Sequence, residues 1–116
     1  MLAGPWQDVL IDQSEDGKLS EEADLGANYE FLTVLIPTIT SSAITVHITD
    51  TKGGTYYPLF AFDGNATGDF AHATTAATTT HAVVFRIGGV QFIKINSDSA
   101  QAADRTFRVR GFNAGF

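Results

Sequence analysis

Residues 12–23 hold the most suggestive local chemistry in the chain. Oxygen-bearing side chains stand at the first, third and fifth positions of this segment, and Gly17 stands at the sixth. Alternating oxygen ligands around a glycine turn are the pattern of an EF-hand calcium loop, whose twelfth residue is a bidentate Glu. The twelfth residue here is Ala23, and Glu22 stands one position early. The segment therefore favours a solvated acidic turn, with a calcium site as the alternative.

Two further groups of residues carry potential metal ligands. Residues 63–69 read Asp-Gly-Asn-Ala-Thr-Gly-Asp, which places an oxygen-bearing side chain at every other position. This spacing can wrap a hard cation, but it is also the composition of two consecutive turns between strands. The three histidines are His47, His72 and His81, and their spacing matches no known zinc site. We therefore expect no metal and no cofactor.

No arrangement of side chains indicates catalysis. The sequence contains neither a Gly-x-Ser-x-Gly nucleophile turn nor a glycine-rich loop that would hold a phosphate before a helix. It also contains no cysteine, which excludes disulfides, thiolate metal sites and cysteine nucleophiles. We expect a protein without enzymatic activity.

Aromatic and arginine side chains are the best candidates for binding a partner. Tyr56 and Tyr57 are adjacent and able to lie exposed, where they would stack on a sugar or enter a contact between subunits. Three arginines stand within six residues near the C-terminus, and two of them project from one face of a strand. Acidic side chains of the same or a neighbouring subunit would complement them. The predicted partner-binding residues are Trp6, Asp8, Asp12, Glu15, Asp16, Tyr56, Tyr57, Arg105, Arg108 and Arg110.

Strands are expected to position these side chains. Residues 43–50 alternate cleanly, with Ile44, Val46 and Ile48 on one face and His47 on the other, where we expect it to be exposed. The other predicted strands are residues 29–36, 55–62, 81–87, 90–96 and 106–110, with residues 6–11 a possible seventh. No window favours an amphipathic helix, although residues 20–25 could make one short turn. Short strands with glycine-rich turns predict an all-β fold, an antiparallel β-sandwich or jelly roll of about six to eight strands.

Glycine and proline set the expected ends of these strands. Gly88-Gly89 predicts a two-residue hairpin, and Lys52-Gly53-Gly54 predicts a second turn of the same kind, since glycine readily adopts positive φ. Pro37 is expected to end the first long strand, and Pro58 to place its strand at a sheet edge or a bulge. Residues 71–82, rich in Ala and Thr, predict a long surface loop, or alternatively a loop that orders against a neighbouring subunit.

Charge divides the chain into two parts. The net charge of −6 belongs to residues 1–26, which hold seven acidic residues and one lysine, whereas residues 27–116 hold six acidic and six basic residues. We therefore predict an extended acidic N-terminal arm, residues 1–28, that lies on its own domain or on another chain. Residues 29–116 are predicted to form a single β-sandwich domain.

The same charge distribution and the hydropathy pattern exclude some partners. An acidic chain without a basic cluster is not expected to bind nucleic acid, because that binding needs clustered Lys and Arg. No apolar stretch approaches the length of a membrane-spanning helix, and the first residues lack the pattern of a secretory signal. We expect no membrane partner.

Four stretches of the chain resemble small virion proteins encoded by tailed bacteriophages. They are residues 24–29 (Asp-Leu-Gly-Ala-Asn-Tyr), 33–39 (Thr-Val-Leu-Ile-Pro-Thr-Ile), 85–95 (Phe-Arg-Ile-Gly-Gly-Val-Gln-Phe-Ile-Lys-Ile) and 102–111 (Ala-Ala-Asp-Arg-Thr-Phe-Arg-Val-Arg-Gly). They lie within residues 24–112, nearly the whole predicted domain, and they are structural rather than catalytic motifs. The resemblance implies a head-associated structural protein, above all a capsid decoration or cement protein, and it implies no catalytic residue.

Composition and resemblance together predict a function. We expect a decoration protein that stabilises a phage head by bridging subunits of the major capsid protein, with copies of itself as a further partner. It would lie on the head surface of a virion assembled in the host cytoplasm, and residues 1–28 and 71–82 would make its contacts. The alternatives are a tail or head-fibre component that binds a receptor, and a non-catalytic carbohydrate-binding β-sandwich module that uses Trp6, Tyr56 and Tyr57.

Overall fold

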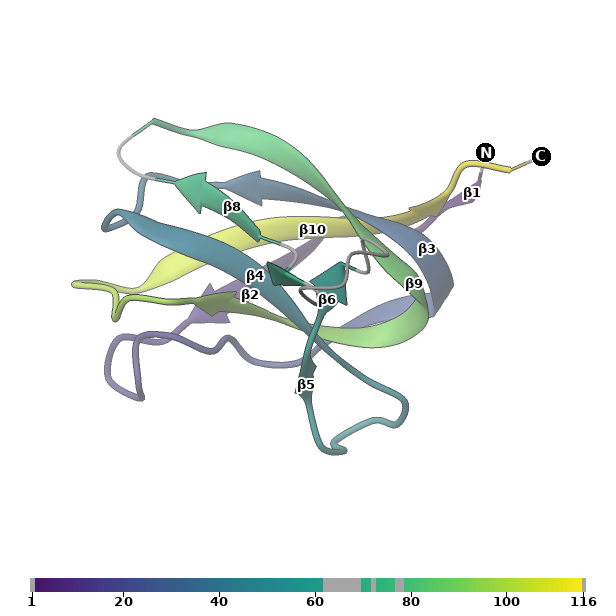
Figure 1. Cartoon of the computed structure of the whole chain (residues 1–116), viewed down its shortest axis with the longest axis horizontal. Coiled ribbons are helices and arrows are strands. Elements are labelled where there is room, and N and C mark those ends of the chain that lie inside the picture. The colour runs from purple at the N-terminus through teal and green to yellow at the C-terminus, as the bar shows by residue number, and fades with distance from the viewer. Residues whose placement is uncertain (1, 62–69, 72, 77–78, 116) are drawn as a thin grey trace.

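The computed structural model describes residues 2–61, 70–71, 73–76 and 79–115, and every regular element among them is a β-strand (Figure 1). The strands are β1 (Leu2–Ala3), β2 (Gln7–Ile11), β3 (Ala23–Ile36), β4 (Ser42–Thr49), β5 (Tyr57–Pro58), β6 (Phe60–Ala61), β7 (Phe70–Ala71), β8 (Ala73–Ala76), β9 (His81–Ser97) and β10 (Arg105–Asn113). Eight of them form one antiparallel sheet in the order β1-β10-β3-β9-β4-β5, in which β2 also pairs with β10 and β8 with β4. The all-β, sandwich-like fold class is thus confirmed.

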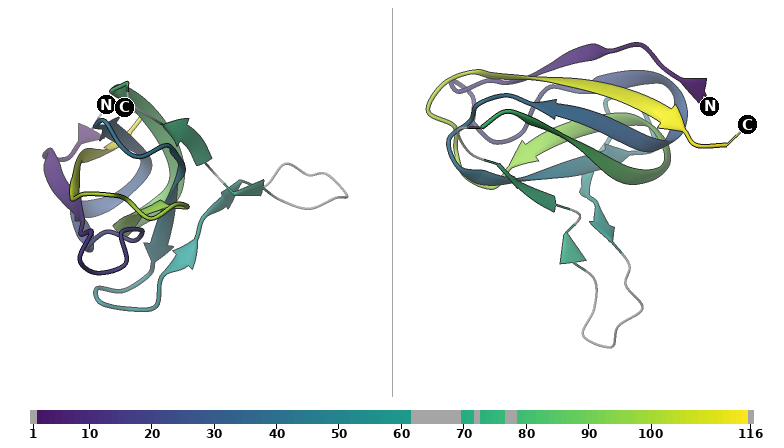
Figure 2. Two further views of the ribbon diagram at one scale, coloured as in Figure 1. Left: turned by 90° about the vertical axis from the view of Figure 1, so that its left-hand side faces the viewer. Right: turned by 90° about the horizontal axis from the view of Figure 1, so that it is seen from above.

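The two longest strands, β3 and β9, bend the sheet into two layers. Residues 31–36 of β3 pair with residues 81–86 of β9, whereas the second half of β9 pairs with β4 (Figure 2). Apolar side chains fill the space between the layers. Those of Val34, Phe107 and Val109 come from β3 and β10, and those of Ile44, Val46, Ile93 and Ile95 come from β4 and β9. All seven side chains are fully buried, with an exposed fraction of 0 %.

The N-terminal residues close the open side of this sandwich. Strand β2 pairs with β10 from Gln7↔Val109 to Ile11↔Arg105. The next residues then bridge β2 to β9, because Glu21 donates to the Leu10 carbonyl (3.2 Å) and Ser20 donates to the Ile95 carbonyl (2.8 Å). Val9, Ile11, Ala23 and Leu25 are buried in the core. The predicted arm therefore lies on its own domain, and β3 continues across residue 28 without a break.

The expected Gly88-Gly89 hairpin is wrong, although both glycines have the positive φ that it required (81° and 91°). They lie inside the continuous strand β9, at a bulge opposite the segment of β3 between Tyr29 and Phe31. A hairpin would need the two halves of β9 to pair with each other. They pair instead with β3 and β4, so the glycines bend one strand where it passes between layers.

The effects of Pro37 and Pro58 on the strands are predicted correctly, but the length of the strand at residues 55–62 is not. Strand β3 ends at Ile36, immediately before Pro37, and Pro58 lies in β5, the last strand of the sheet order. The turn at Gly53 joins β4 to β5, with a φ of 69°. Residues 55–62 do not form one strand, because the described part divides into β5 and β6.

Two further expectations are corrected. Residues 20–25 make no helical turn, because Ser20 bonds to β9 and β3 begins at Ala23. Within residues 71–82, predicted as a loop, Ala73–Ala76 form β8, which pairs with Ser42–Thr45 of β4. Residues 72 and 77–78 of that segment lie outside the described residues. No helix among the described residues is long and apolar enough to cross a membrane.

Candidate functional site

The ten predicted partner-binding residues are distributed over four places in the fold. Trp6, Asp8, Arg108 and Arg110 lie together on β2, β10 and the residues before β2. Asp12, Glu15 and Asp16 lie together in the turn that follows β2. Arg105 lies at the start of β10, and Tyr56 and Tyr57 lie at β5.

The first group forms a surface that we call the arginine–tryptophan face, consisting of Trp6, Asp8, Arg108, Arg110 and Phe112. Alternation along β10 buries Phe107 and Val109 and therefore turns the two arginines outward. Their guanidinium carbons lie 5.8 Å (Arg108) and 5.6 Å (Arg110) from the centre of the Trp6 ring, within the range of a cation–π contact.

Each arginine of this face has a second contact. Arg108 is directly opposite Asp8 in the strand register, and its Nε lies 3.1 Å from Asp8 Oδ1. Arg110 donates from Nε to the Gly4 carbonyl at 2.9 Å, and none of the described carboxylates forms an ion pair with it. The expected pairing of an acidic residue with an arginine is thus formed within one chain by Asp8 and Arg108. The positive charge of Arg110 has no carboxylate partner among the described residues.

A hollow of about 170 Å³ opens on this face. Its lining residues are Ala3, Trp6, Thr33, Arg110 and Phe112. Phe112 is fixed by stacking on Phe31, with ring centres 5.2 Å apart and planes inclined by 19°. Trp6 is 36 % exposed, so its ring forms an accessible wall. The Phe31–Phe112 stack was not predicted, because it depends on the register between β3 and β10.

The apolar surface continues from the hollow across β3 to β9. Leu32 and Val34 are buried, so the alternate residues of β3 face outward, among them Leu35, which is 38 % exposed. On the neighbouring strand Val84 is 55 % exposed and lies opposite Thr33. Aliphatic, aromatic and arginine side chains gathered on one sheet face are the composition of a protein-binding surface.

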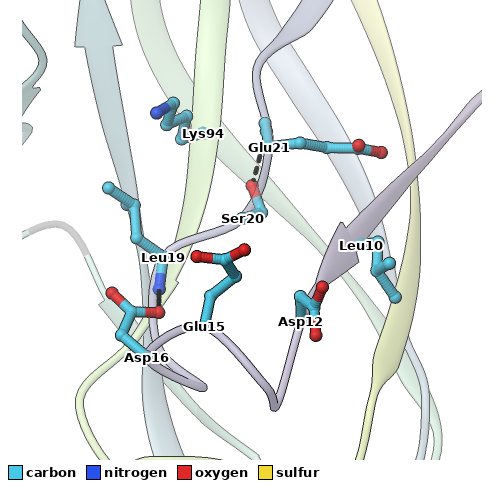
Figure 3. A pocket seen from close by; sticks show the side chains of 8 residues that line it. All are labelled: Leu10, Asp12, Glu15, Asp16, Leu19, Ser20, Glu21 and Lys94. Carbon is cyan, nitrogen blue, oxygen red and sulfur yellow. Dashed lines mark hydrogen bonds between the residues drawn. The ribbon is translucent and has the colours of Figure 1, made fainter.

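The second group lines a larger hollow of about 620 Å³, the acidic hollow. Its lining residues are Leu10, Asp12, Glu15, Asp16, Leu19, Ser20, Glu21 and Lys94 (Figure 3). Of these, Leu10 and Lys94 come from outside the predicted turn, residues 12–23. They were not predicted, because nothing in their spacing shows that residues 12–21 lie beside β9.

Internal hydrogen bonds hold the acidic turn in shape. Asp12 Oδ1 accepts from the Ser14 hydroxyl (2.7 Å) and backbone N–H (2.9 Å), and these bonds hold the pKa of the Asp12 carboxyl below its usual value. Asp16 Oδ1 accepts from the backbone N–H groups of Lys18 and Leu19, and its pKa is lowered for the same reason. Gly17, which stands between Asp16 and Lys18, adopts a φ of 69°.

The Asp12 and Asp16 carboxylates each accept hydrogen bonds from within the turn through Oδ1. Among the described residues no group of three or more His, Asp or Glu side chains is placed to hold a metal ion. The second predicted cation loop, residues 63–69, and His72 lie outside the described residues. His47 is half-buried rather than exposed, and burial lowers its pKa, because it lies between Lys94 and Pro58 on the neighbouring strands.

The two tyrosines differ in their surroundings. The Tyr56 hydroxyl donates to Glu22 Oε2, which also accepts from the Gly53 N–H, and Lys94 lies 4.7 Å from the centre of the Tyr56 ring. Burial and the Glu22 carboxylate raise the pKa of Tyr56, while the Tyr56 hydroxyl lowers the pKa of Glu22. Tyr57 is 60 % exposed. The structure does not bring these tyrosines together with Trp6, because β5 and β10 lie far apart in the sheet order.

Arg105 is half-buried, and its guanidinium group bonds within the chain. It donates to Gln101 Oε1 and to Thr40 Oγ1, both at 3.2 Å. Gln101 is buried and also bonds to both backbone groups of Thr40. This network fastens the loop between β9 and β10 over one end of the core.

Comparison with known proteins shows a shared fold and no family. No protein-family model and no curated protein sequence matches the chain. Among solved structures, the SPBc2 prophage-derived protein YomS is similar with a TM-score of 0.56 and 17% identity, over 96% of this chain and 95% of that chain. The coat protein dimer of Tobacco streak virus covers 97% of this chain and 87% of its own, with 10% identity. Its TM-score of 0.38 is below the range of a shared fold. The chain therefore has the fold of a prophage-derived protein along nearly its whole length.

Proposed function

We propose that the chain is a virion structural protein, a capsid decoration or cement protein that stabilises a phage head by bridging subunits of the major capsid protein. It has no enzymatic activity, lies on the head surface, and contacts copies of itself as well as the capsid. The observation that carries this proposal is the fold that the chain shares with a prophage-derived protein over 96% of its length. The resemblance of residues 24–112 to small phage virion proteins supports it independently.

The surface of the molecule supports binding rather than catalysis. The arginine–tryptophan face offers aromatic and arginine side chains, which dominate the energetics of protein interfaces. Its residues on β2 and β10 adjoin the apolar surface of β3 and β9, so a rigid sheet presents both and little conformational entropy is lost on binding.

A capsid-binding assay tests the proposal. Purified chain is added to expanded capsids that lack it, and the bound fraction is measured by co-sedimentation. We expect saturable binding, and we expect Arg108→Glu to lower the affinity at least about tenfold, because reversing a charge at an interface repels the partner. Deleting residues 1–26 is not a suitable variant, because it removes β2 and the core residues Val9 and Ile11.

Lys52→Glu is the matched control for this assay. It makes the same change of charge on an exposed residue in the turn that joins β4 to β5, away from β10 and its neighbours. Equal loss with both variants would show a general effect of charge, and absence of binding by the unchanged chain would overturn the proposal.

A further inference from the structure

We infer that the hollow of the arginine–tryptophan face receives the acidic turn of a second copy of this chain, so that copies associate head to tail. The inference rests on the part of the proposed function that concerns contacts between copies, and it names the two surfaces that meet.

Placement in the fold keeps these two surfaces apart within one chain. The acidic turn follows Ile11, which pairs with Arg105 at the start of β10. The hollow is lined by Ala3 and Phe112, which pair at the other end of β10. In Figure 1 the turn after β2 lies at the left end of the long axis, and β1 lies at the right end. The turn and the hollow can therefore meet only between molecules.

Charge identifies the occupant. Arg110 lines the hollow and pairs with none of the described carboxylates. It lies against Trp6, as does Arg108, which is paired with Asp8. The acidic hollow at the other end is lined by four carboxylates against one lysine. A charged surface with an apolar centre selects a partner of opposite charge, and the chain carries that partner at its opposite end.

The other three acidic residues of the N-terminal segment do not line the acidic hollow and contact other parts of the chain. Asp8 pairs with Arg108, Glu22 accepts from Tyr56, and Asp24 accepts from Gln91 and the Gly26 N–H. Four carboxylates thus remain grouped at the turn. The turn is also held rigid by the hydrogen bonds of Asp12 and Asp16 and by the bond from the Gln13 N–H to Asp104. Little conformational entropy is therefore lost when it docks.

A contact between two different surfaces is heterologous. Repeating it generates a ring where the rotation closes and a chain of molecules where it does not. Either assembly would link neighbouring decoration proteins on a lattice. The contact is electrostatic at its rim, so we expect it to weaken as salt rises from about 0.05 M to about 1 M.

Sedimentation of the purified full chain tests the inference. We expect the weight-average mass to rise with protein concentration at low salt and to fall as salt is added. Arg110→Glu, and separately Glu15→Arg, should each weaken self-association at least about tenfold. Lys52→Glu and Asp50→Arg are the matched controls, because they make the same changes in net charge as Arg110→Glu and Glu15→Arg at exposed sites that line neither hollow.

Mixing the two reversed variants gives the decisive result. In the equimolar mixture the unchanged hollow of Glu15→Arg can receive the unchanged turn of Arg110→Glu, and the reversed hollow can receive the reversed turn. The mixture should therefore regain the mass that each variant alone loses. Because Arg110 also bonds to the Gly4 carbonyl, Thr33→Glu serves as a second variant that adds an acid to the hollow wall and leaves Arg110 in place. It too should abolish self-association.

Three outcomes would overturn the inference: an unchanged chain that stays monomeric at low salt, a mixture that does not recover, or controls that lose as much as the test variants. A monomeric chain that still binds a Glu-Gly peptide through Arg110 would assign the hollow to another acidic protein. Capsid binding is measured separately, so its failure and that of self-association are distinguishable.

Discussion

At the scale of single residues, Gly111 marks a position of β10 where an added side chain would collide with Tyr29. A Cβ at this position would lie 2.7 Å from Tyr29 Cγ, and the Tyr29 ring also lies against Gly4. The Tyr29 ring of β3 thus packs against the backbone of both glycines, at β10 and directly after β1.

We predict that Gly111→Ala destabilises the protein by about 1–3 kcal/mol, because the Tyr29 ring must move from a packed position. Chemical denaturation followed by tryptophan fluorescence measures the change. Gly115→Ala is the control, since a Cβ there meets no atom within 4 Å. Equal stability of Gly111→Ala and the unchanged chain would contradict the packing described.

Tyr56 gives a second prediction at this scale, which concerns pH. Its pKa is raised in the folded state, so the folded protein favours the protonated phenol more than the unfolded chain does. The resulting stabilisation is complete below the ordinary tyrosine pKa of about 10 and is lost as pH rises above it.

Ultraviolet titration of the phenols measures this behaviour. We expect one of the three tyrosines to ionise later than an ordinary tyrosine, and we expect Tyr56→Phe to remove that late phase. The variant should also lose about 1 kcal/mol of stability at neutral pH, because it leaves Glu22 without the phenol donor. Tyr57→Phe is the control, and a late phase that persists in Tyr56→Phe would refute the assignment.

At the scale of elements, β2 and residues 17–21 complete the sandwich. Strand β2 covers the outer edge of β10, and the Leu10–Glu21 and Ser20–Ile95 bonds continue the backbone ladder to β9. The N-terminal segment is therefore acidic on its outer side and apolar on its inner side.

We predict that Ile11→Ala destabilises the protein by about 2–5 kcal/mol, because Ile11 is fully buried and its truncation leaves a cavity. Leu2→Ala, which removes a side chain that is 70% exposed, should change stability by less than about 0.5 kcal/mol. Thermal denaturation measures both. If the two variants melted alike, the N-terminal segment would not be part of the core.

The same elements show how far the sequence predicts the fold. Alternation located β4 and β10 closely, and the positions of Pro37 and Pro58 were interpreted correctly, because these signals are local. The Gly88-Gly89 hairpin was not correct, because positive φ at two glycines is compatible with a hairpin and with a bulge. Only the pairing partners of β9, which lie far away in the sequence, decide between the two.

The candidate site could be predicted in part for the same reason. Alternation placed Arg108 and Arg110 on one face, and Asp8, the acidic partner of Arg108, comes from the N-terminal segment as expected. The hollow could not be predicted, since it needs β1, β3 and β10 in one register. The different environments of Tyr56 and Tyr57 could not be predicted either, because Glu22 contacts Tyr56 only in the folded chain.

At the scale of the whole molecule, the distribution of charge connects the fold to the proposed function. Asp8, Glu22 and Asp24 bind the N-terminal segment to the rest of the chain, and the four carboxylates of the acidic hollow remain at one end. An arginine and aromatic surface lies at the other end and across the neighbouring sheet face. The molecule thus presents two surfaces of opposite charge on a rigid scaffold, as a protein that links neighbours on a lattice requires.

The number of copies of this protein in each purified phage particle tests that account most directly. Quantitative mass spectrometry against a known amount of the major capsid protein gives the number. A protein that bridges capsid subunits follows the symmetry of the lattice, so the account predicts on the order of hundreds of copies. About a dozen copies or fewer would instead indicate a component of a vertex or tail, and would contradict the proposal that the protein decorates the capsid.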